Sequence, residues 1–133
     1  MFKIAKRGVA DVAPIEYMEG TANETIALGE ALKVSSGKLT KAGAADEVTH
    51  ICMGVKNDKG LFPVIAVQPY MYFETTSTAT VAATAVGTAV KLHTDGLTVT
   101  ATVGGPFVID ETDGATTNST VVGHFTKPAT VAA

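Results

Sequence analysis

The sequence predicts an all-β fold, a small sandwich or barrel with at most one short helix. Three observations point to this fold class. Thr, Ala and Val are the commonest of the 133 residues, and the β-branched side chains of Thr and Val suit pleated strands. Turn residues recur at intervals of about eight to twelve positions, which is typical of sandwiches and barrels. Apolar residues make up 46% and charged residues 17% of the chain, a balance that excludes intrinsic disorder.

The first thirteen residues are predicted to form an extended N-terminal arm, which Pro14 closes. Phe2 and Ile4 alternate loosely with Lys6 and Arg7, without an apolar stripe of helical period. Such a segment either frays, pairs within its own domain, or adds a strand to the sheet of another chain. In the last case its basic side chains would steer it towards an acidic surface.

Residues 14–133 are predicted to be a single β domain. In its first half, turns at residues 35–37 and 57–60 separate apolar runs. Pro63 lies inside the run of residues 61–67, which indicates an edge strand or a bulge at that place. The strands expected in this half are 25–28, 31–34, 38–40, 48–55, 61–67 and 70–75.

The second half shows the same rhythm of apolar runs and glycine turns. Residues 77–85 are rich in Ala and predict either an irregular connection or one short helix, although their Thr and Val content disfavours the helix. The strands expected in this half are 89–92, 97–103, 107–109 and 120–125.

A motif of the form A-h-G-x-A-h-K-h, in which h is aliphatic, occurs at residues 27–34 and again at residues 85–92. Each copy precedes a turn with glycine and then a strand. A second match joins residues 48–55 to residues 117–125, because both contain an apolar run that closes on glycine. We therefore expect two similar β units in the domain, at about 25–75 and 83–127.

The sequence predicts no catalytic residue, no metal site and no cofactor. His50, His93 and His124 lack the spacing that places two metal ligands on one face, and His50 and His124 are expected to have structural roles in matching strands. Cys52 lies in an apolar run and is expected to be a buried, unreactive thiol. Residues 110–114, D-E-T-D-G, form the densest acidic cluster but lack the spacing of a calcium loop, so we expect a solvated turn.

The charge balance and the apolar runs restrict the possible partners. The net charge of -3 and the pI of about 5.5 argue against a nucleic-acid partner. Apolar runs stay well short of the ~20 residues that a membrane span requires, so no membrane partner is expected. The single cysteine excludes a disulfide within the chain.

Residues 29–39 read G-E-A-L-K-V-S-S-G-K-L, Asp46 and Glu47 follow, and an apolar strand ends at Gly54-Val55. Together with the extended arm, this order resembles the head decoration proteins of tailed phages, which are also called capsid cement proteins. The resemblance extends to the small β-rich decoration protein of lambda-like phages and to the β-tulip cement proteins. It implies a β-tulip-like fold and a structural role in place of an enzymatic one.

The resemblance implies that the chain binds the outer surface of the expanded head as a homotrimer and stabilises the head against the pressure of the packaged DNA. The implied partners are the major capsid protein and further copies of the chain. The implied location is the exterior of the virion, after assembly in the host cytoplasm.

The arm and the resemblance together assign two sets of contact residues. Contacts with the capsid are assigned to Phe2, Ile4, Lys6 and Arg7. Aromatic residues are enriched at the cores of interfaces, and packing inside the domain is the alternative role for such a group. Contacts between subunits are assigned to Tyr70, Tyr72 and Phe73.

Two other interpretations stay open. One is a different virion subunit, from the tail tube or from head completion. The other is a carbohydrate-binding or adhesion β-sandwich, which needs exposed aromatic side chains on one face and has Tyr17, Tyr70 and Tyr72 for this purpose. An enzyme is the class that the sequence favours least.

Overall fold

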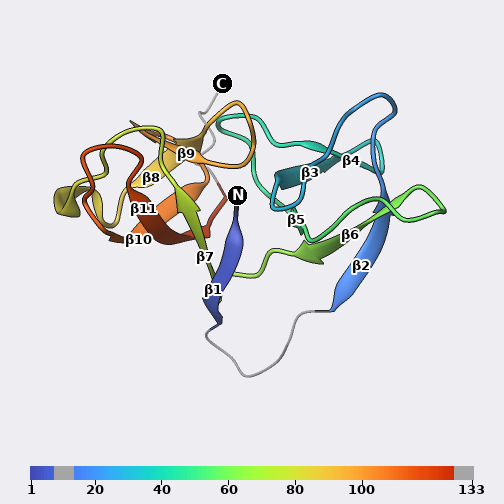
Figure 1. Ribbon diagram of the computed structural model, residues 1–133, viewed down its shortest axis with the longest axis horizontal. Coiled ribbons are helices and arrows are strands. Elements are labelled where there is room, and N and C mark those ends of the chain that lie inside the picture. Colours follow the sequence, from blue (N-terminus) through green and yellow to red (C-terminus); the bar gives the residue numbers. More distant parts are fainter. Residues whose placement is uncertain (8–13, 128–133) are drawn as a thin grey trace.

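The computed structural model describes residues 1–7 and 14–127, and this part of the chain is all-β, as predicted. Its strands form two antiparallel sheets in a sandwich-like arrangement (Figure 1). A turn of 3₁₀ helix, η1 (Ala83–Ala85), is the one helical element among these residues, and it is far too short to cross a membrane. The strands are β1 (Lys3–Arg7), β2 (Ile15–Glu19), β3 (Ala31–Ser35), β4 (Lys38–Lys41), β5 (His50–Cys52), β6 (Leu61–Ala66), β7 (Met71–Thr76), β8 (Ala89–Leu92), β9 (Val99–Val103), β10 (Phe107–Thr112) and β11 (Thr120–Phe125).

The two sheets differ by one strand. Sheet A has the order β1-β7-β11-β10-β8-β9, and sheet B has the order β2-β6-β5-β3-β4. Residues 25–28 lie in the loop between β2 and β3 and do not form the expected strand. The edge position expected from Pro63 is also wrong, because β6 lies between β2 and β5. The Pro63 carbonyl accepts the Met53 N–H at 2.8 Å, just beyond the end of β5. Proline has no N–H to donate in return, so Pro63 removes only the last backbone hydrogen bond between β6 and the β5 segment.

Both sheets repeat one topology. Strands β2 to β6 occupy the same places in sheet B as β7 to β11 in sheet A, in the same chain order, and β1 is an extra strand beside β7. The closing contacts match as well, because Gly20 forms an isolated bridge with Leu39 of β4, and Ser77 forms one with Val99 of β9. The chain therefore contains two equivalent β units, residues 15–66 and 71–125, and each begins one strand earlier than the sequence predicts.

The repeated A-h-G-x-A-h-K-h motif folds in the same way in both units. Its glycine has a φ of 81° at Gly29 and 91° at Gly87, a conformation that glycine adopts at little cost. Strand β3 or β8 then begins two residues later. The same two hydrogen bonds fix each copy: Gly29 N–H to Cys52 O (2.8 Å) and Cys52 N–H to Glu30 O (3.1 Å), and Gly87 N–H to Ile109 O (2.7 Å) and Ile109 N–H to Thr88 O (3.0 Å).

This hydrogen bonding corrects the second predicted match between the two halves. Strand β5 corresponds to β10 and not to β11. In the pairing registers His50 takes the place of Phe107, and His124 takes the place of Ile65. The two histidines are therefore not equivalent, and the repeat gives them no common role.

The main hydrophobic core lies between the two sheets. Successive residues of a strand point to opposite faces, so Ala31, Ile51 and Ile65 of sheet B join the core shared with sheet A. Their neighbours Leu32, Cys52 and Val64 face the other way, into a second core that the loop between β2 and β3 closes with Ile26. The inner strands β5 and β6 of sheet B therefore have buried residues on both faces, which explains the nearly continuous apolar run of β6.

Two backbone hydrogen bonds cross between the units. The Ala31 N–H at the start of β3 donates to the Gly96 carbonyl in the turn between β8 and β9, at 2.8 Å. The Leu92 N–H at the end of β8 donates to the Ala44 carbonyl in the loop between β4 and β5, at 3.0 Å. Each unit thus satisfies a strand N–H of the other unit.

The N-terminal segment belongs to the domain, because β1 pairs antiparallel with β7. Phe2 is 2% exposed, and its ring centroid lies 5.5 Å from that of Phe107 and 5.2 Å from that of Phe125. The prediction of a separate arm is therefore wrong for residues 1–7, whose apolar side chains find partners in their own core. The rest of the predicted arm, residues 8–13, lies outside the described residues.

A buried carboxyl group lies in the motif of the first unit. Glu30 is 2% exposed; its Oε1 accepts the Ala27 N–H at 3.3 Å, while its Oε2 has no hydrogen-bond partner among the described residues. In the second unit Thr88 takes this place, and its hydroxyl donates to the Ala85 carbonyl at 2.6 Å. Burial raises the pKa of the Glu30 carboxyl above its usual 4.5, more than the Ala27 N–H lowers it.

Replacing Phe2 by Ala should destabilise the free protein, because it removes a ring from the core and leaves a cavity. We expect a loss of about 3 kcal/mol and a fall in Tm of about 10 °C, measured by circular dichroism. Lys3→Ala, at the exposed neighbouring position, is the control and should change the stability by less than about 0.5 kcal/mol. A Phe2→Ala variant that melts like the wild type would mean that the segment is not part of the core.

Replacing Glu30 by Gln should raise the Tm at pH 7. The raised pKa means that the folded state binds the proton more tightly than the unfolded state does, so ionisation at neutral pH costs folding free energy. Below pH 4.5 the carboxyl is protonated in both states, and the advantage of Gln should shrink towards zero.

The measurement is the difference in Tm between Glu30→Gln and the wild type at pH 7 and at pH 4. Asp58→Asn removes the same charge from an exposed turn and should show no such difference. A Glu30→Gln variant that is no more stable at pH 7 than at pH 4, relative to the wild type, would contradict a raised pKa.

Candidate functional site

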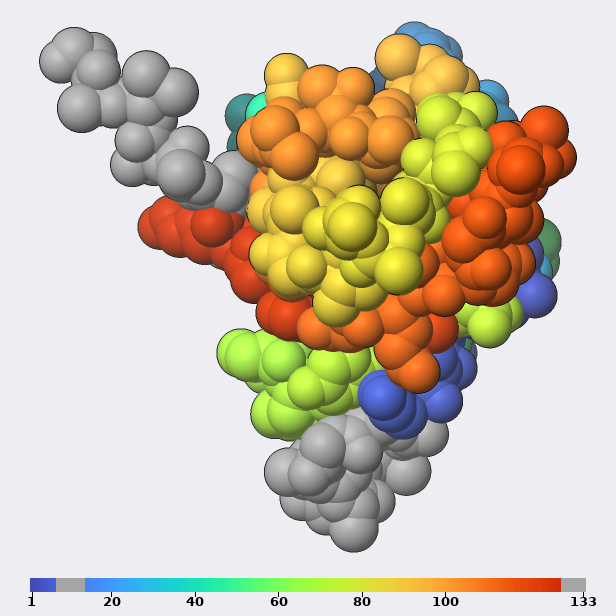
Figure 2. All heavy atoms as spheres, turned by 90° about the vertical axis from the view of Figure 1, so that its left-hand side faces the viewer, coloured from blue at the N-terminus to red at the C-terminus, as the bar shows by residue number. Residues whose placement is uncertain are grey.

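The residues assigned to capsid contact lie on or beside the edge strand β1. Phe2 is buried in the core, so its assignment as a contact side chain is wrong. Ile4 is partly buried against the same core, while Lys6 is exposed and its Nζ lies 3.2 Å from Glu111 Oε2. Arg7 belongs to β1, but its side chain is outside the described residues. Figure 2 shows the N-terminal segment in dark blue at the molecular surface.

The residues assigned to subunit contact do not share one surface, because successive side chains of β7 point to opposite faces of sheet A. Phe73 is fully buried and packs edge-to-face on Phe125 at 5.3 Å, so its assignment to an interface is wrong. Tyr72 points to the opposite, outer face of sheet A. Tyr70 precedes β7 and is 38% exposed.

A row of polar side chains crosses the outer face of sheet A; we call Lys6, Tyr72, His124 and Asp110 the outer row. The Lys6 ammonium lies 5.2 Å from the centre of the Tyr72 ring, and the Tyr72 ring packs edge-on against His124 at 5.8 Å. His124 Nδ1 lies 2.6 Å from Asp110 Oδ2. The row comes from four adjacent strands, and its members already bind one another.

The other polar residues singled out in the sequence also have local partners. Asp113 Oδ1 accepts the N–H groups of Ala115 and Thr120 at 3.0 and 3.1 Å, so Asp113 lies in the expected turn. The turn expected for Asp110 and Glu111 is wrong, because both lie in strand β10. Cys52 is a free, buried thiol that donates to the Gly54 carbonyl at 3.0 Å, and burial raises its pKa. Within residues 1–7 and 14–127, no group of three or more His, Cys, Asp or Glu side chains is arranged to hold a metal ion.

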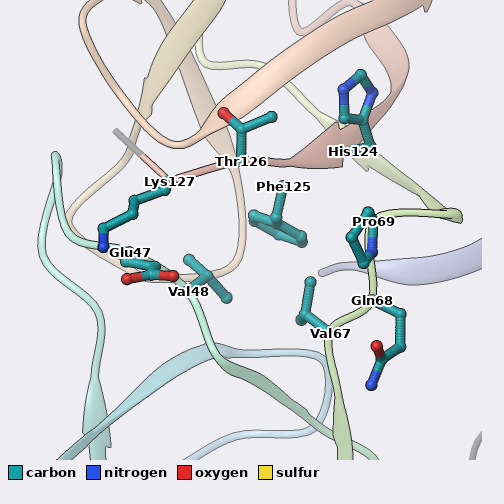
Figure 3. A pocket seen from close by; sticks show the side chains of 9 residues that line it. All are labelled: Glu47, Val48, Val67, Gln68, Pro69, His124, Phe125, Thr126 and Lys127. Carbon is teal, nitrogen blue, oxygen red and sulfur yellow. The ribbon is translucent and has the colours of Figure 1, made fainter. Parts of the chain in front are cut away.

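A hollow of about 430 Å³ lies where the two units join (Figure 3). Its apolar wall contains Val48, Val67 and Phe125, while Glu47 and Lys127 lie together on one side in the figure. The lining comes from the segment before β5, the link between β6 and β7, and the end of β11. The hollow therefore marks the joint between the two units.

Exposed apolar side chains gather on the first unit, beside β2. Ile15 and Tyr17 lie two residues apart on one face of β2 and are 54% and 58% exposed. Tyr17 is opposite Pro63 in the sheet, and the Pro63 ring lies against Gly54, which precedes Val55, 83% exposed. We call Ile15, Tyr17, Pro63 and Val55 the β2 patch.

The analysis of the sequence missed β2. Residues 15–19 read I-E-Y-M-E, and the alternation of Ile15, Tyr17 and Glu19 with Glu16 and Met18 after a proline is a strand signal. Four of these five residues are exposed, so the strand has no buried stripe that would mark it as part of a core. The exposed apolar side chains of an edge strand are instead a signal of a binding surface.

Comparison of the chain with models of protein families, with curated proteins and with solved structures finds no match.

Proposed function

We propose that this chain is a head decoration protein of a tailed phage, which binds the outer surface of the expanded head and stabilises it against internal DNA pressure. The residues that resemble decoration proteins, 29–39, 46–47 and 54–55, all lie in the first β unit. That unit also carries the β2 patch. The patch is the single observation that carries the proposal, because it offers an apolar docking surface beside the resembling residues.

The proposal moves the capsid contact from the N-terminal segment to the β2 patch. Single exposed apolar residues are common on soluble proteins, whereas adjacent ones mark interaction sites. Burying a side chain such as Val55 or Tyr17 against a partner contributes about 1.5–3 kcal/mol. Several such side chains on one rigid sheet therefore supply a useful contact without any movement of the fold.

A decoration protein acts by mass action, since a ligand that binds only the expanded shell stabilises that shell. Three copies joined as a homotrimer would present three patches at once, and the second and third contacts would then form at high effective concentration. A modest contact per copy is sufficient under these conditions. The proposed partners are accordingly the major capsid protein and further copies of the chain.

The direct test is electron cryo-microscopy of the particles that the genome encoding this chain produces. Heads made without the chain should lack a density on their outer surface, and adding the purified protein should restore it. Heads without the protein should also open at a lower temperature or at lower osmotic shock. Density in the tail tube or at the neck, or particles that do not contain the chain, would overturn the proposal.

Val55→Asp should weaken binding to such heads by about tenfold or more, because a charge replaces an apolar contact worth at least about 1.4 kcal/mol. The measurement is a titration of undecorated heads with labelled protein. The Tm of the free variant should not change, since Val55 is 83% exposed.

Val103→Asp is the matched control. Val103 is 62% exposed on β9, which belongs to sheet A, whereas β2 belongs to sheet B, so this variant should bind heads like the wild type. Equal loss of binding in both variants would show that the β2 patch is not the contact.

A further inference from the structure

We propose that copies of this chain associate head to tail, with the outer edge of β1 in one copy pairing with the outer edge of β2 in the next. The juxtaposition that carries this inference is a basic edge strand on one sheet and an acidic edge strand on the other. The proposal concerns the free protein and does not depend on the binding of phage heads.

Strands β1 and β2 end the two sheets at edges that pair with no strand among the described residues. Isolated bridges join the opposite end strands to the residues that follow β2 and β7, Leu39 of β4 to Gly20 and Val99 of β9 to Ser77. Among the described residues, Ile15–Glu19 of β2 themselves pair only with β6. Both free edges are accessible, as Lys3, Ala5 and Lys6 of β1 and Ile15, Glu16, Tyr17 and Glu19 of β2 are all exposed. An exposed edge of unpaired N–H and C=O groups is a template for pairing with another strand.

The internal repeat provides a precedent for adding a strand at β2. In the second unit, β7 holds the place that β2 holds in the first, and β7 is covered by β1. The same edge position is left open at β2 (Figure 1). Adding β1 of another copy would complete the first unit as β1 completes the second, and it would join sheet A of one copy to sheet B of the next.

The charges of the two strands select this pairing over its alternatives. Strand β1 reads K-I-A-K-R and strand β2 reads I-E-Y-M-E. Two β1 edges would bring lysines together, and two β2 edges would bring glutamates together, which is unfavourable in both cases. A β1 edge against a β2 edge brings opposite charges together along the whole strand.

This charge match does not depend on which face of β2 the lysines of the incoming strand lie on, because β2 carries a glutamate on each face. Glu16 and Glu19 lie on opposite faces of β2, so Lys3 and Lys6 of an incoming β1 meet a carboxylate on either face. Within the chain, Glu16 and Glu19 have His50 and Lys38 at 3.5 and 3.4 Å, with glutamate side chains 51% and 62% exposed. The exposed Glu19–Lys38 ion pair contributes little to stability, so it is readily exchanged for an intermolecular pair.

A contact between two different edges is heterologous, and it has a geometric consequence. Such contacts close into a ring if the rotation between copies allows it, and otherwise they build an open chain. In a ring, and inside an open chain, each copy pairs through its β1 edge with one neighbour and through its β2 edge with the other.

The test uses two double charge reversals of the full chain. Lys3→Glu/Lys6→Glu removes the basic edge and keeps β2 intact, and Glu16→Lys/Glu19→Lys removes the acidic edge and keeps β1 intact. Sedimentation at low salt should show association of the wild type that weakens as salt is added, and a monomer of 13.6 kDa for each variant alone. A 1:1 mixture of the two variants should associate again, because each β1 edge then meets a β2 edge of opposite charge on the other variant.

Two matched controls carry the same charge changes away from both edges. Lys56→Glu/Lys59→Glu and Glu47→Lys/Asp58→Lys alter exposed residues outside β1 and β2 and should associate like the wild type. Thermal melting checks that every variant is folded. A wild type that stays monomeric at all concentrations, a charge-reversed variant that still self-associates, or a mixture that stays monomeric would each overturn the proposal.

Discussion

Four phenylalanine rings hold this fold together. Phe2, Phe73, Phe107 and Phe125 pack edge-on or tilted at centroid distances between 5.1 and 5.5 Å, and they come from the N-terminal segment, β7, β10 and β11. The chain has no Trp, so these rings and small aliphatic side chains fill the space between the sheets. Because Phe2 is one of the four, the ring cluster fixes β1 on β7 and thereby decides which sheet edges remain open.

The duplicated topology makes the surface of the molecule easy to interpret. Equivalent strands have equivalent neighbours in the two units, with one exception, which is that β1 covers β7 while β2 stays uncovered. The exposed apolar and acidic side chains lie at this exception, on β2. A binding role is thus supported by a difference between two otherwise matching units. This difference supports the role better than a single exposed side chain would.

The sequence predicted the all-β class, most strands and the repeated motif, because turn residues and apolar runs are local signals. It did not predict the pairing of β1 with β7, since the loose alternation of Phe2 and Ile4 suits a strand in any sheet. It missed β2 because exposed side chains give no buried stripe. The second repeat match failed because β5 and β10 share hydrogen bonds and not side chains, as His50 in place of Phe107 illustrates.

The crossed hydrogen bonds of Ala31 and Leu92 have a consequence for how the molecule unfolds. Each bond leaves one unit and ends on a loop of the other, and Ile51 and Ile65 of the first unit belong to the core that it shares with the second. Separating the halves would expose these side chains and break both bonds at once. Although each half has its own complete set of five strands, we therefore expect the two halves to unfold together.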